Sequence, residues 1–551
     1  MYTLNRIALL IASISLAACG SSEAGDGGGG NVGFGGAQDI GQFRSILDSG
    51  GIPGAETLDA NGFFNEHFTE LPDADCGQTL CTYAMVSVGR DWVAGEHQAV
   101  MQISMKTPID PTTLVRKPLN MVVVVDTSGS MTADNRLTYV KQGLEILIDE
   151  LQEGDRLGIV EYNSNVRVVA ELADALDKET LKQRVRGLVA GGSTNIFGGL
   201  SGGFTMLANN MDIERQNRVM FLSDGLATAG DTSTASIIAM SEGYISEGIG
   251  LTTIGVGSSF NVDLMRGLAE RGAGNFYFLE SAAAIDEVFS DELDFFVTPI
   301  ALDLQLTVSP GAYTLGTVVG TRLWKTQGSL GRVDIPAAFV SSRTSTTPGN
   351  GPRGGGSSIF VRMLPDPGAT ENLEQVAQVQ LSYRLPGQTE RITQTVDVIN
   401  PNQPGETPEE TWTSHVAMEK NYAMYNLFLG LREAAREAAT DYSCALSTLN
   451  ILREDAAIWN ELRQDEDIAA DIELVDSFAA NLRAAGAYAD DPQQACDTGW
   501  IPDPDYPYGD DYEHDGAYAC SSGGSTPGSG FALLLMAGAF VLLRRRKSAR
   551  G

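Results

Sequence analysis

Five oxygen-bearing side chains follow apolar or Gly-rich stretches at three separate places in the chain. Three of them come directly after the apolar run 122–125, one lies in the Gly-rich segment 191–195, and one follows a second apolar run at 219–222. These residues are Asp126, Ser128, Ser130, Thr194 and Asp224. Hard divalent cations such as Mg²⁺ and Mn²⁺ prefer oxygen ligands, whereas Zn²⁺ would call for His or Cys. The sequence therefore predicts a Mg²⁺ or Mn²⁺ site.

The two apolar runs are typical of buried parallel strands. Four β-branched residues in succession at 122–125 fit a strand that is covered on both faces. Apolar residues recur at helical spacing over 137–151, and further helices are expected at about 196–211, 232–248 and 283–297. Such alternation predicts a doubly wound α/β fold, in which ligands bind outside the carboxyl ends of the strands. The five side chains should therefore meet at one edge of the sheet.

The order Asp-x-Ser-x-Ser, then Thr, then Asp resembles the metal-ion-dependent adhesion site of the von Willebrand factor A (vWA) family. All five positions match, and the segments 155–162 and 254–257 resemble two further strands of that family. The resemblance covers roughly residues 117 to 298. It implies a Rossmann-like α/β domain that binds ligands through a divalent metal.

The resemblance also implies a role for each residue of the set. Ser128, Ser130 and Thr194 would bind the metal directly, whereas Asp126 and Asp224 would act mostly through water. A simpler alternative is that these hydroxyls and acids only cap helices. The agreement of three separate segments argues for the metal site.

The N-terminus has the pattern of an export signal. An apolar run at 7–16 is followed by small residues and then by Cys19. The segment 16–19 resembles a bacterial lipobox, which implies that Cys19 becomes the acylated first residue; a plain signal peptide cut near Ala18 is the alternative. The following residues 20–36 are rich in Gly and Ser, so we expect a flexible linker.

The C-terminus carries a second targeting pattern. Cys520 and a Gly/Ser-rich stretch precede the apolar run 531–543, which is followed by the basic cluster 544–547. The run is short for a membrane span, which needs about 20 residues, and the basic residues would stay in the cytoplasm. The combination resembles MYXO-CTERM sorting signals of surface proteins, with an ordinary tail anchor as the alternative. We expect an exported protein of the bacterial cell envelope, at the outer membrane or cell surface, held by the N-terminal lipid, the C-terminal anchor or both.

The four remaining cysteines favour disulfides, because they form an even set in an exported chain. Each of two pairs lies within one local segment, so we expect Cys76 to pair with Cys81 and Cys444 with Cys496. A Zn²⁺ site is the weaker alternative, since the spacing does not fit and no histidine is close to either pair.

The segments on either side of the vWA-like region share another pattern. Apolar and polar residues alternate in several runs of 299–400, as is typical of a half-buried antiparallel sandwich. The segments 82–88 and 99–105 also resemble strands but are too few for a stable sheet. We therefore expect the α/β domain to be inserted in one composite β-sandwich. A helix with a capping box is expected from Thr407, as the start of a small helical bundle.

The expected fold is α/β, with a doubly wound vWA (Rossmann-like) domain inserted in a β-sandwich and followed by a small helical bundle. The expected segments are a signal peptide with lipobox (1–19), a flexible linker (20–36), an N-terminal accessory segment contributing β-strands (37–116), the vWA domain (117–298), the β-sandwich (299–400), the helical domain (407–498), an acidic and Gly/Ser-rich stalk (499–530) and a C-terminal hydrophobic anchor with basic tail (531–551). Weak Ca²⁺ binding by the acidic stretch 503–515 is the alternative to a disordered stalk, but the stretch lacks the spacing of an EF-hand loop.

The formal net charge of −34 argues against a nucleic-acid ligand, whose binding depends on Lys and Arg. The expected function is non-enzymatic, metal-dependent adhesion or ligand binding, in which the metal captures an Asp or Glu of a protein partner. One alternative is a structural envelope scaffold whose metal only stabilises the loops. A metal-dependent hydrolase is less favoured, because none of the four histidines lies in the vWA-like region to serve as general base.

Overall fold

The computed structural model describes the greater part of the chain between residues 30 and 488. The described residues are 30–37, 40–95, 97–110, 114, 116–257, 260–279, 285, 288–289, 298–341, 343–344, 352–353, 356–365, 375–399 and 412–488. Cys19, Cys496, Cys520, the predicted stalk and the two predicted targeting segments lie outside them. Among the described residues no helix is long and apolar enough to span a membrane.

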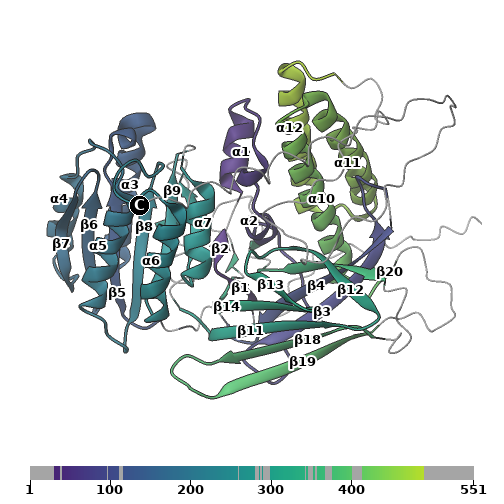
Figure 1. Ribbon diagram of the computed structural model, residues 1–551, viewed down its shortest axis with the longest axis horizontal. Helices are drawn as coiled ribbons and strands as arrows, with labels where there is room; N and C mark the ends of the chain where they lie inside the picture. Colours follow the sequence, from purple (N-terminus) through teal and green to yellow (C-terminus); the bar gives the residue numbers. More distant parts are fainter. Residues whose placement is uncertain are drawn as a thin grey trace, which may run out of the picture. The chain divides into compact units, whose positions relative to one another are not determined.

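A seven-stranded sheet with helices on both faces forms an α/β domain (Figure 1). Its strand order is β2-β10-β9-β8-β5-β6-β7, and all neighbours are parallel except β6 and β7. The strands are β2 (Gly36–Ala37), β5 (Leu119–Asp126), β6 (Arg156–Tyr162), β7 (Val166–Asp174), β8 (Gln216–Ser223), β9 (Gly250–Val256) and β10 (Asn275–Leu279). The central position of β5 explains its apolar run, because helices cover both of its faces.

The helices of this domain divide between the two faces of the sheet. Val123 packs in a cluster with α3 and α4, whereas Val124 packs in a cluster with α5, α6 and α7. The helices are α3 (Arg136–Glu150), α4 (Lys178–Arg186), α5 (Ile196–Ala208), α6 (Thr234–Ser246) and α7 (Val262–Arg271). Three of the four expected helices are thus confirmed, and the expected helix at 283–297 falls mostly outside the described residues. The sequence did not predict α4 or α7; α4 has only one buried residue, so it shows no apolar period.

The second part of the fold is a β-sandwich built from strands on both sides of the α/β domain. One layer runs β20-β3-β4-β17-β12, the other contains β13, β14, β11, β18 and β19, and β1 pairs with both. The strands are β1 (Gly30–Phe34), β3 (Cys81–Arg90), β4 (His97–Thr107), β11 (Ala301–Pro310), β12 (Tyr313–Val319), β13 (Trp324–Gln327), β14 (Leu330–Val340), β17 (Ile359–Pro365), β18 (Gln375–Arg384), β19 (Arg391–Ile399) and β20 (Trp412–Thr413). Two short strands, β15 (Arg343–Thr344) and β16 (Pro352–Arg353), pair separately.

The insertion of the α/β domain is visible in the strand pairing. Ile359 of β17 pairs with Ile103 of β4, and apolar side chains from both layers form one buried cluster. Strands that precede the α/β domain therefore share a sheet with strands that follow it. The predicted fold class, a doubly wound domain inserted in a β-sandwich, is confirmed.

The last part of the predicted flexible linker is ordered structure, so the prediction for residues 20–36 is wrong from residue 30 onward. These residues form β1 and, directly afterwards, β2 at the edge of the α/β sheet. Val32 and Phe34 have exposed fractions of 0% and 3% and pack in the sandwich core. A Cβ at Gly35 would lie 2.2 Å from the carbonyl oxygen of Gly274, so glycine allows this close approach. Here glycine allows two backbone segments to approach closely, and does not indicate a flexible linker.

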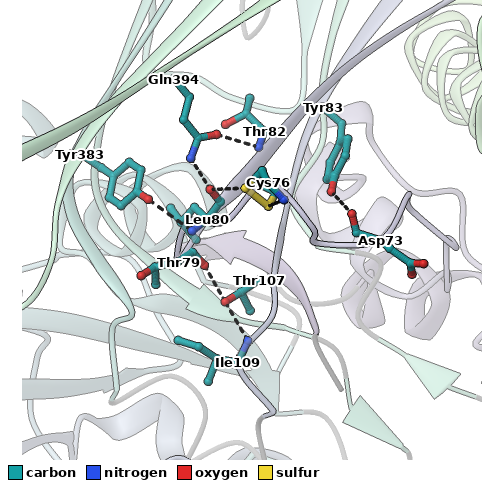
Figure 2. Close-up of a disulfide and its surroundings, with 11 residues drawn as sticks. Asp73, Cys76, Thr79, Leu80, Thr82, Tyr83, Thr107, Ile109, Tyr383 and Gln394 are labelled. Atoms are coloured by element: carbon teal, nitrogen blue, oxygen red, sulfur yellow. Dashed lines mark hydrogen bonds between the residues drawn. A yellow bond between two sulfur atoms is a disulfide. The ribbon is translucent and has the colours of Figure 1, made fainter. Parts of the chain in front are cut away.

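A disulfide joins Cys76 and Cys81 in a short loop that ends at β3 (Figure 2). The backbone N–H of Leu80 donates to the hydroxyl of Tyr383 in β18 at 3.3 Å. The carbonyl oxygen of Leu80 accepts from the side-chain amide of Gln394 in β19. The loop therefore connects the two layers of the sandwich by hydrogen bonds.

Three helices form the predicted helical bundle, namely α10 (Ala417–Glu437), α11 (Tyr442–Arg463) and α12 (Glu466–Ala484). The prediction that a helix runs from Thr407 is wrong, because Trp412 and Thr413 pair with β3 as strand β20 and the helix begins at Ala417. Aromatic and β-branched side chains favour a strand at this point. Cys444 is buried near the start of α11, and its pairing with Cys496 stays a prediction.

The accessory segment packs its helices on this bundle. Phe63 and Phe64 of α2 contact Phe428 of α10, and Phe43 of α1 contacts Phe478 of α12. The accessory elements are α1 (Gly41–Asp48), the 3₁₀ helix η1 (Ala55–Thr57) and α2 (Ala60–Asn65). The bundle and the accessory segment thus share one apolar core.

Candidate functional site

Three loops meet at the carboxyl edge of the α/β sheet. They follow β5, precede α5 and follow β8. The N–H of Gly129 donates to the carbonyl oxygen of Gly192 at 3.0 Å, and the N–H of Thr228 donates to that of Thr194 at 2.9 Å. These backbone bonds hold the loops, and with them the predicted site residues, in one place.

The side chains of this edge form a connected row. The hydroxyl oxygens of Ser128 and Ser130 are 3.0 Å apart, and the Ser130 hydroxyl donates to Oδ1 of Asp224 at 2.7 Å. Thr194 lies beside this row, because a Cβ built on Gly225 would be 3.8 Å from Ser130 Oγ and 3.9 Å from Thr194 Oγ1. The structure therefore brings these predicted oxygen donors together.

Asp126 lies behind the row at the end of β5 and is fully buried. Its Oδ1 accepts from the backbone N–H of Ser128 at 2.8 Å, and its Oδ2 accepts from the hydroxyls of Tyr162 at 3.1 Å and Ser223 at 2.9 Å. Burial raises the pKa of Asp126, and the nearby charge of Asp224 acts in the same direction. The geometry makes Asp126 the residue that orients the loop carrying Ser128.

Tyr162 and Ser223 were missed by sequence reasoning, although a signal exists. Each is a polar residue at the carboxyl end of a strand next to β5, which is where ligand-facing side chains collect in such sheets. Burial raises the pKa of Tyr162 well above its ordinary value, with the Asp126 charge adding to the effect. Tyr162 therefore stays a hydrogen-bond donor to Asp126.

Arg136 is a third residue that the sequence reasoning missed. Its Nη1 lies 3.0 Å from Oδ2 of Asp224, and the two side chains are 10% and 0% exposed. Arg136 opens helix α3, where a cation is disfavoured by the helix dipole. A basic residue at the start of a helix, directly after the loop that carries Ser128 and Ser130, is a sequence signal for a nearby carboxylate.

The donor set fits a hard divalent cation. The hydroxyls of Ser130 and Thr194 flank the position of Gly225, and Ser130 in turn contacts the Ser128 hydroxyl and the Asp224 carboxylate. Ser130 is exposed to solvent. In the part of the chain that the structure describes, no group of three or more His, Cys, Asp or Glu side chains is placed to hold a metal. The set at this edge is a metal-site candidate on the chemistry of its own oxygen donors.

Comparison with known proteins identifies the domain. Residues 120–291 match the family model for the von Willebrand factor type A domain. The Escherichia coli K12 protein YfbK is 29% identical over 190 residues, which are 34% of this chain and 33% of that protein. Inter-alpha-trypsin inhibitor heavy chain H2 of Sus scrofa is 26% identical over 213 residues, 35% of this chain and 22% of that protein.

The chain thus spans a third or less of the length of these two curated relatives. A solved von Willebrand factor type A structure from Catenulispora acidiphila is 15% identical, covers 70% of this chain and 88% of that chain, and has a TM-score of 0.45. Residues 120–291 of this chain are a von Willebrand factor type A (vWA) domain.

Proposed function

We propose that this chain is a divalent-metal-dependent adhesion or ligand-binding protein of the bacterial cell envelope. The observation that carries the proposal is the hydrogen-bonded row Ser128–Ser130–Asp224 with Thr194 beside it. In this proposal Ser128, Ser130 and Thr194 hold Mg²⁺ or Mn²⁺ directly, and Asp126 and Asp224 accept hydrogen bonds from the hydroxyls or from water.

A bound cation of this kind would supply positive charge and an open coordination position for a carboxylate. The chain's own residues prepare that position: Asp126 fixes the Ser128 loop from behind, and Ser130 faces solvent. Leu226, two residues after Asp224, is 55% exposed and offers an apolar contact next to the charged group. The proposed partner is a protein that presents Asp or Glu.

We infer binding rather than catalysis from how the two acids are used. Both oxygens of Asp126 accept hydrogen bonds, from Ser128, Tyr162 and Ser223. Both oxygens of Asp224 are also engaged. A general base must come within hydrogen-bond reach of the proton that it removes, and Asp126 and Asp224 are only 0% and 1% exposed. These acids are instead arranged to position other groups.

A structural scaffold is the second candidate function. One observation favours it: the hydroxyls of Ser128 and Ser130 and the Asp224 carboxylate already have hydrogen-bond partners within the protein, the last of them including Arg136. In that case the metal would stabilise the loops without exchanging ligands, and partner capture would not depend on it.

Metal binding is tested first, with Mn²⁺ titration of the full chain by calorimetry. Ser130→Ala and Thr194→Ala should weaken binding by about tenfold or more, since losing even an outer-shell partner has that effect. Ser246→Ala is the matched control, because it removes an exposed hydroxyl near the opposite edge of the sheet. Wild-type protein that binds no Mn²⁺ at millimolar concentration would contradict the proposal.

Partner capture is tested with envelope extracts, with and without EDTA, using Asp126→Ala as a control. The proposal expects a partner that is lost in EDTA and whose binding is abolished when a single Asp or Glu is replaced by its amide. Binding that is equal in EDTA would favour the scaffold function. Envelope attachment is tested separately by metabolic labelling with palmitate, which Cys19→Ala should abolish.

A further inference from the structure

Asp224 is held between a hydroxyl and a guanidinium. Its Oδ1 accepts from Ser130 at 2.7 Å, and its Oδ2 accepts from Nη1 of Arg136 at 3.0 Å. Asp224 is 1% exposed, so solvent screens this ion pair little. A guanidinium is always protonated, so the metal-site candidate contains a permanent positive charge of its own.

The backbone around Arg136 is specialised for this contact. Asp134 and Asn135 have positive φ angles of 49° and 60°, which non-glycine residues seldom adopt. On the other side of the guanidinium, Gly257 has a φ of +72°, and a Cβ there would lie 2.6 Å from Arg136 Nε. Two left-handed residues and a glycine thus combine to place this side chain. Such backbone strain persists only where the surrounding structure holds it in place. It is found mostly at functional sites.

We propose that Arg136 sets the charge of the metal site: it keeps Asp224 ordered in the absence of metal and lowers the affinity of the site for divalent cations. This inference rests on the proposed metal site. The two buried carboxylates Asp126 and Asp224 carry two negative charges, and Arg136 reduces the net charge of this buried group by one. Arg136 also lies 3.4 Å from the Asp134 carboxylate, but that side chain is 82% exposed and screened by solvent. A cation entering the site is repelled by the guanidinium and attracted by one net negative charge instead of two.

The hydrogen-bond geometry gives Arg136 a positioning role as well. Because the guanidinium occupies Oδ2, the other oxygen of Asp224 is directed at the Ser130 hydroxyl. That hydroxyl donates its hydrogen to Asp224, accepts from the Ser128 hydroxyl through one lone pair and keeps the other lone pair for a cation. With few net charges from the protein, a bound cation retains more of its own charge for an acidic partner.

The test is Mn²⁺ calorimetry and thermal unfolding of the full chain at pH 7.5. Arg136→Gln should bind Mn²⁺ roughly tenfold more tightly, because a like charge a few ångströms away is removed. Without metal, the melting temperature of Arg136→Gln should be lower than that of wild type. Saturating Mn²⁺ should raise the melting temperature of the variant by more than it raises that of wild type. Arg136→Lys keeps the charge and should bind Mn²⁺ about as wild type does.

Arg156→Gln is the matched control, because it removes the same charge at the amino end of β6, where Arg156 pairs with exposed Asp174. Its Mn²⁺ affinity should equal that of wild type. An Arg136→Gln chain that folds only with Mn²⁺ supports the part of the proposal in which Arg136 keeps Asp224 ordered in the absence of metal. Equal or weaker Mn²⁺ binding by folded Arg136→Gln overturns the charge-setting role while leaving the metal site intact. No binding by wild type overturns the metal site itself.

Discussion

Arg266, on helix α7 of the vWA domain, donates to the carboxylate of Asp59 at 2.7 Å, although the two residues are 207 positions apart in the sequence. Both side chains are largely buried, and Asp59 also caps α2 by accepting from the N–H of Gly62. Burial alone would raise the pKa of Asp59, but the charges of Arg266 and Arg322 outweigh it and lower that pKa. The pair therefore joins the inserted domain to the accessory segment.

We predict that Arg266→Gln lowers the free energy of unfolding by about 3–5 kcal/mol, because it leaves the carboxylate of Asp59 buried without its partner. Arg271→Gln, on the same helix but in an exposed pair with Glu242, should lower it by about 0–1 kcal/mol. Urea denaturation of the full chain measures both. Because the pKa of Asp59 is lowered in the folded state, this stabilisation is present above its ordinary value of 3.8 and is lost as the pH falls through the folded-state pKa. Equal effects of the two variants would contradict the prediction.

A second prediction tests the ordered part of the Gly-rich segment. Phe34→Ala should lower the free energy of unfolding by about 3–5 kcal/mol, as for a buried aromatic side chain in a core. If residues 30–36 were a flexible tether, the change would be within about 0.5 kcal/mol. Urea denaturation, with circular dichroism as the readout, distinguishes the two.

A third prediction concerns the disulfide between Cys76 and Cys81. Because the closed loop is short, replacing both residues by Ala should lower the free energy of unfolding by only about 2 kcal/mol. Non-reducing peptide mapping should find these two cysteines in one bonded pair. Pairing of either residue with another cysteine would contradict the structure.

A fourth prediction follows from His67, which contacts Asp471 of α12 at 2.9 Å and the carbonyl oxygen of Phe63 at 2.6 Å. Burial would lower the pKa of His67, but the Asp471 carboxylate outweighs burial and raises that pKa from 6.5 to about 9; Asp467 contributes in the same direction. The folded state therefore binds this proton more tightly than the unfolded state. The resulting stabilisation is fully present below pH 6.5 and is lost as the pH rises through about 9.

Thermal unfolding between pH 6.5 and 9.5 measures this dependence. The melting temperature of wild type should fall with rising pH in this window, by an amount that corresponds to a few kcal/mol at most, since one pKa unit is about 1.4 kcal/mol. His67→Gln should show a smaller fall, whereas His97→Gln, at an exposed residue of β4, should behave as wild type does. An unchanged pH dependence in His67→Gln would exclude His67 as its source.

The metal-site candidate could be predicted because its signals are local in sequence. Asp126 ends and Asp224 directly follows a strand with a long apolar run, and parallel pairing then places the strand ends together. The same reasoning did not find Arg136 or Tyr162, because their positions at a helix start and a strand end indicate a polar role but not the partner. The partners, Asp224 and Asp126, follow only from contacts across the sheet edge.

The failures in the fold also have long-range causes. Residues 30–37 form strands only because β4, β14 and β10 supply partners far along the chain. The helix predicted to begin at Thr407 begins at Ala417 in the structure, because Trp412 pairs with β3 as part of a strand. In both cases tertiary pairing decides the outcome over local composition. The composite sandwich was predictable because the strands at 82–105 needed partners that only the later segment could provide.

The insertion has a consequence for biosynthesis. The side chains of Gln102 and Ser358 are hydrogen-bonded at 3.0 Å but lie 256 residues apart in the sequence. A ribosome that adds roughly 5–20 residues per second needs on the order of 13–50 s between the two. Throughout that interval β4 has been synthesised while its neighbour β17 has not, so one of its edges waits without a strand. The vWA domain, encoded between them, is synthesised before β17, so β4 stays without this neighbour while the inserted domain is made.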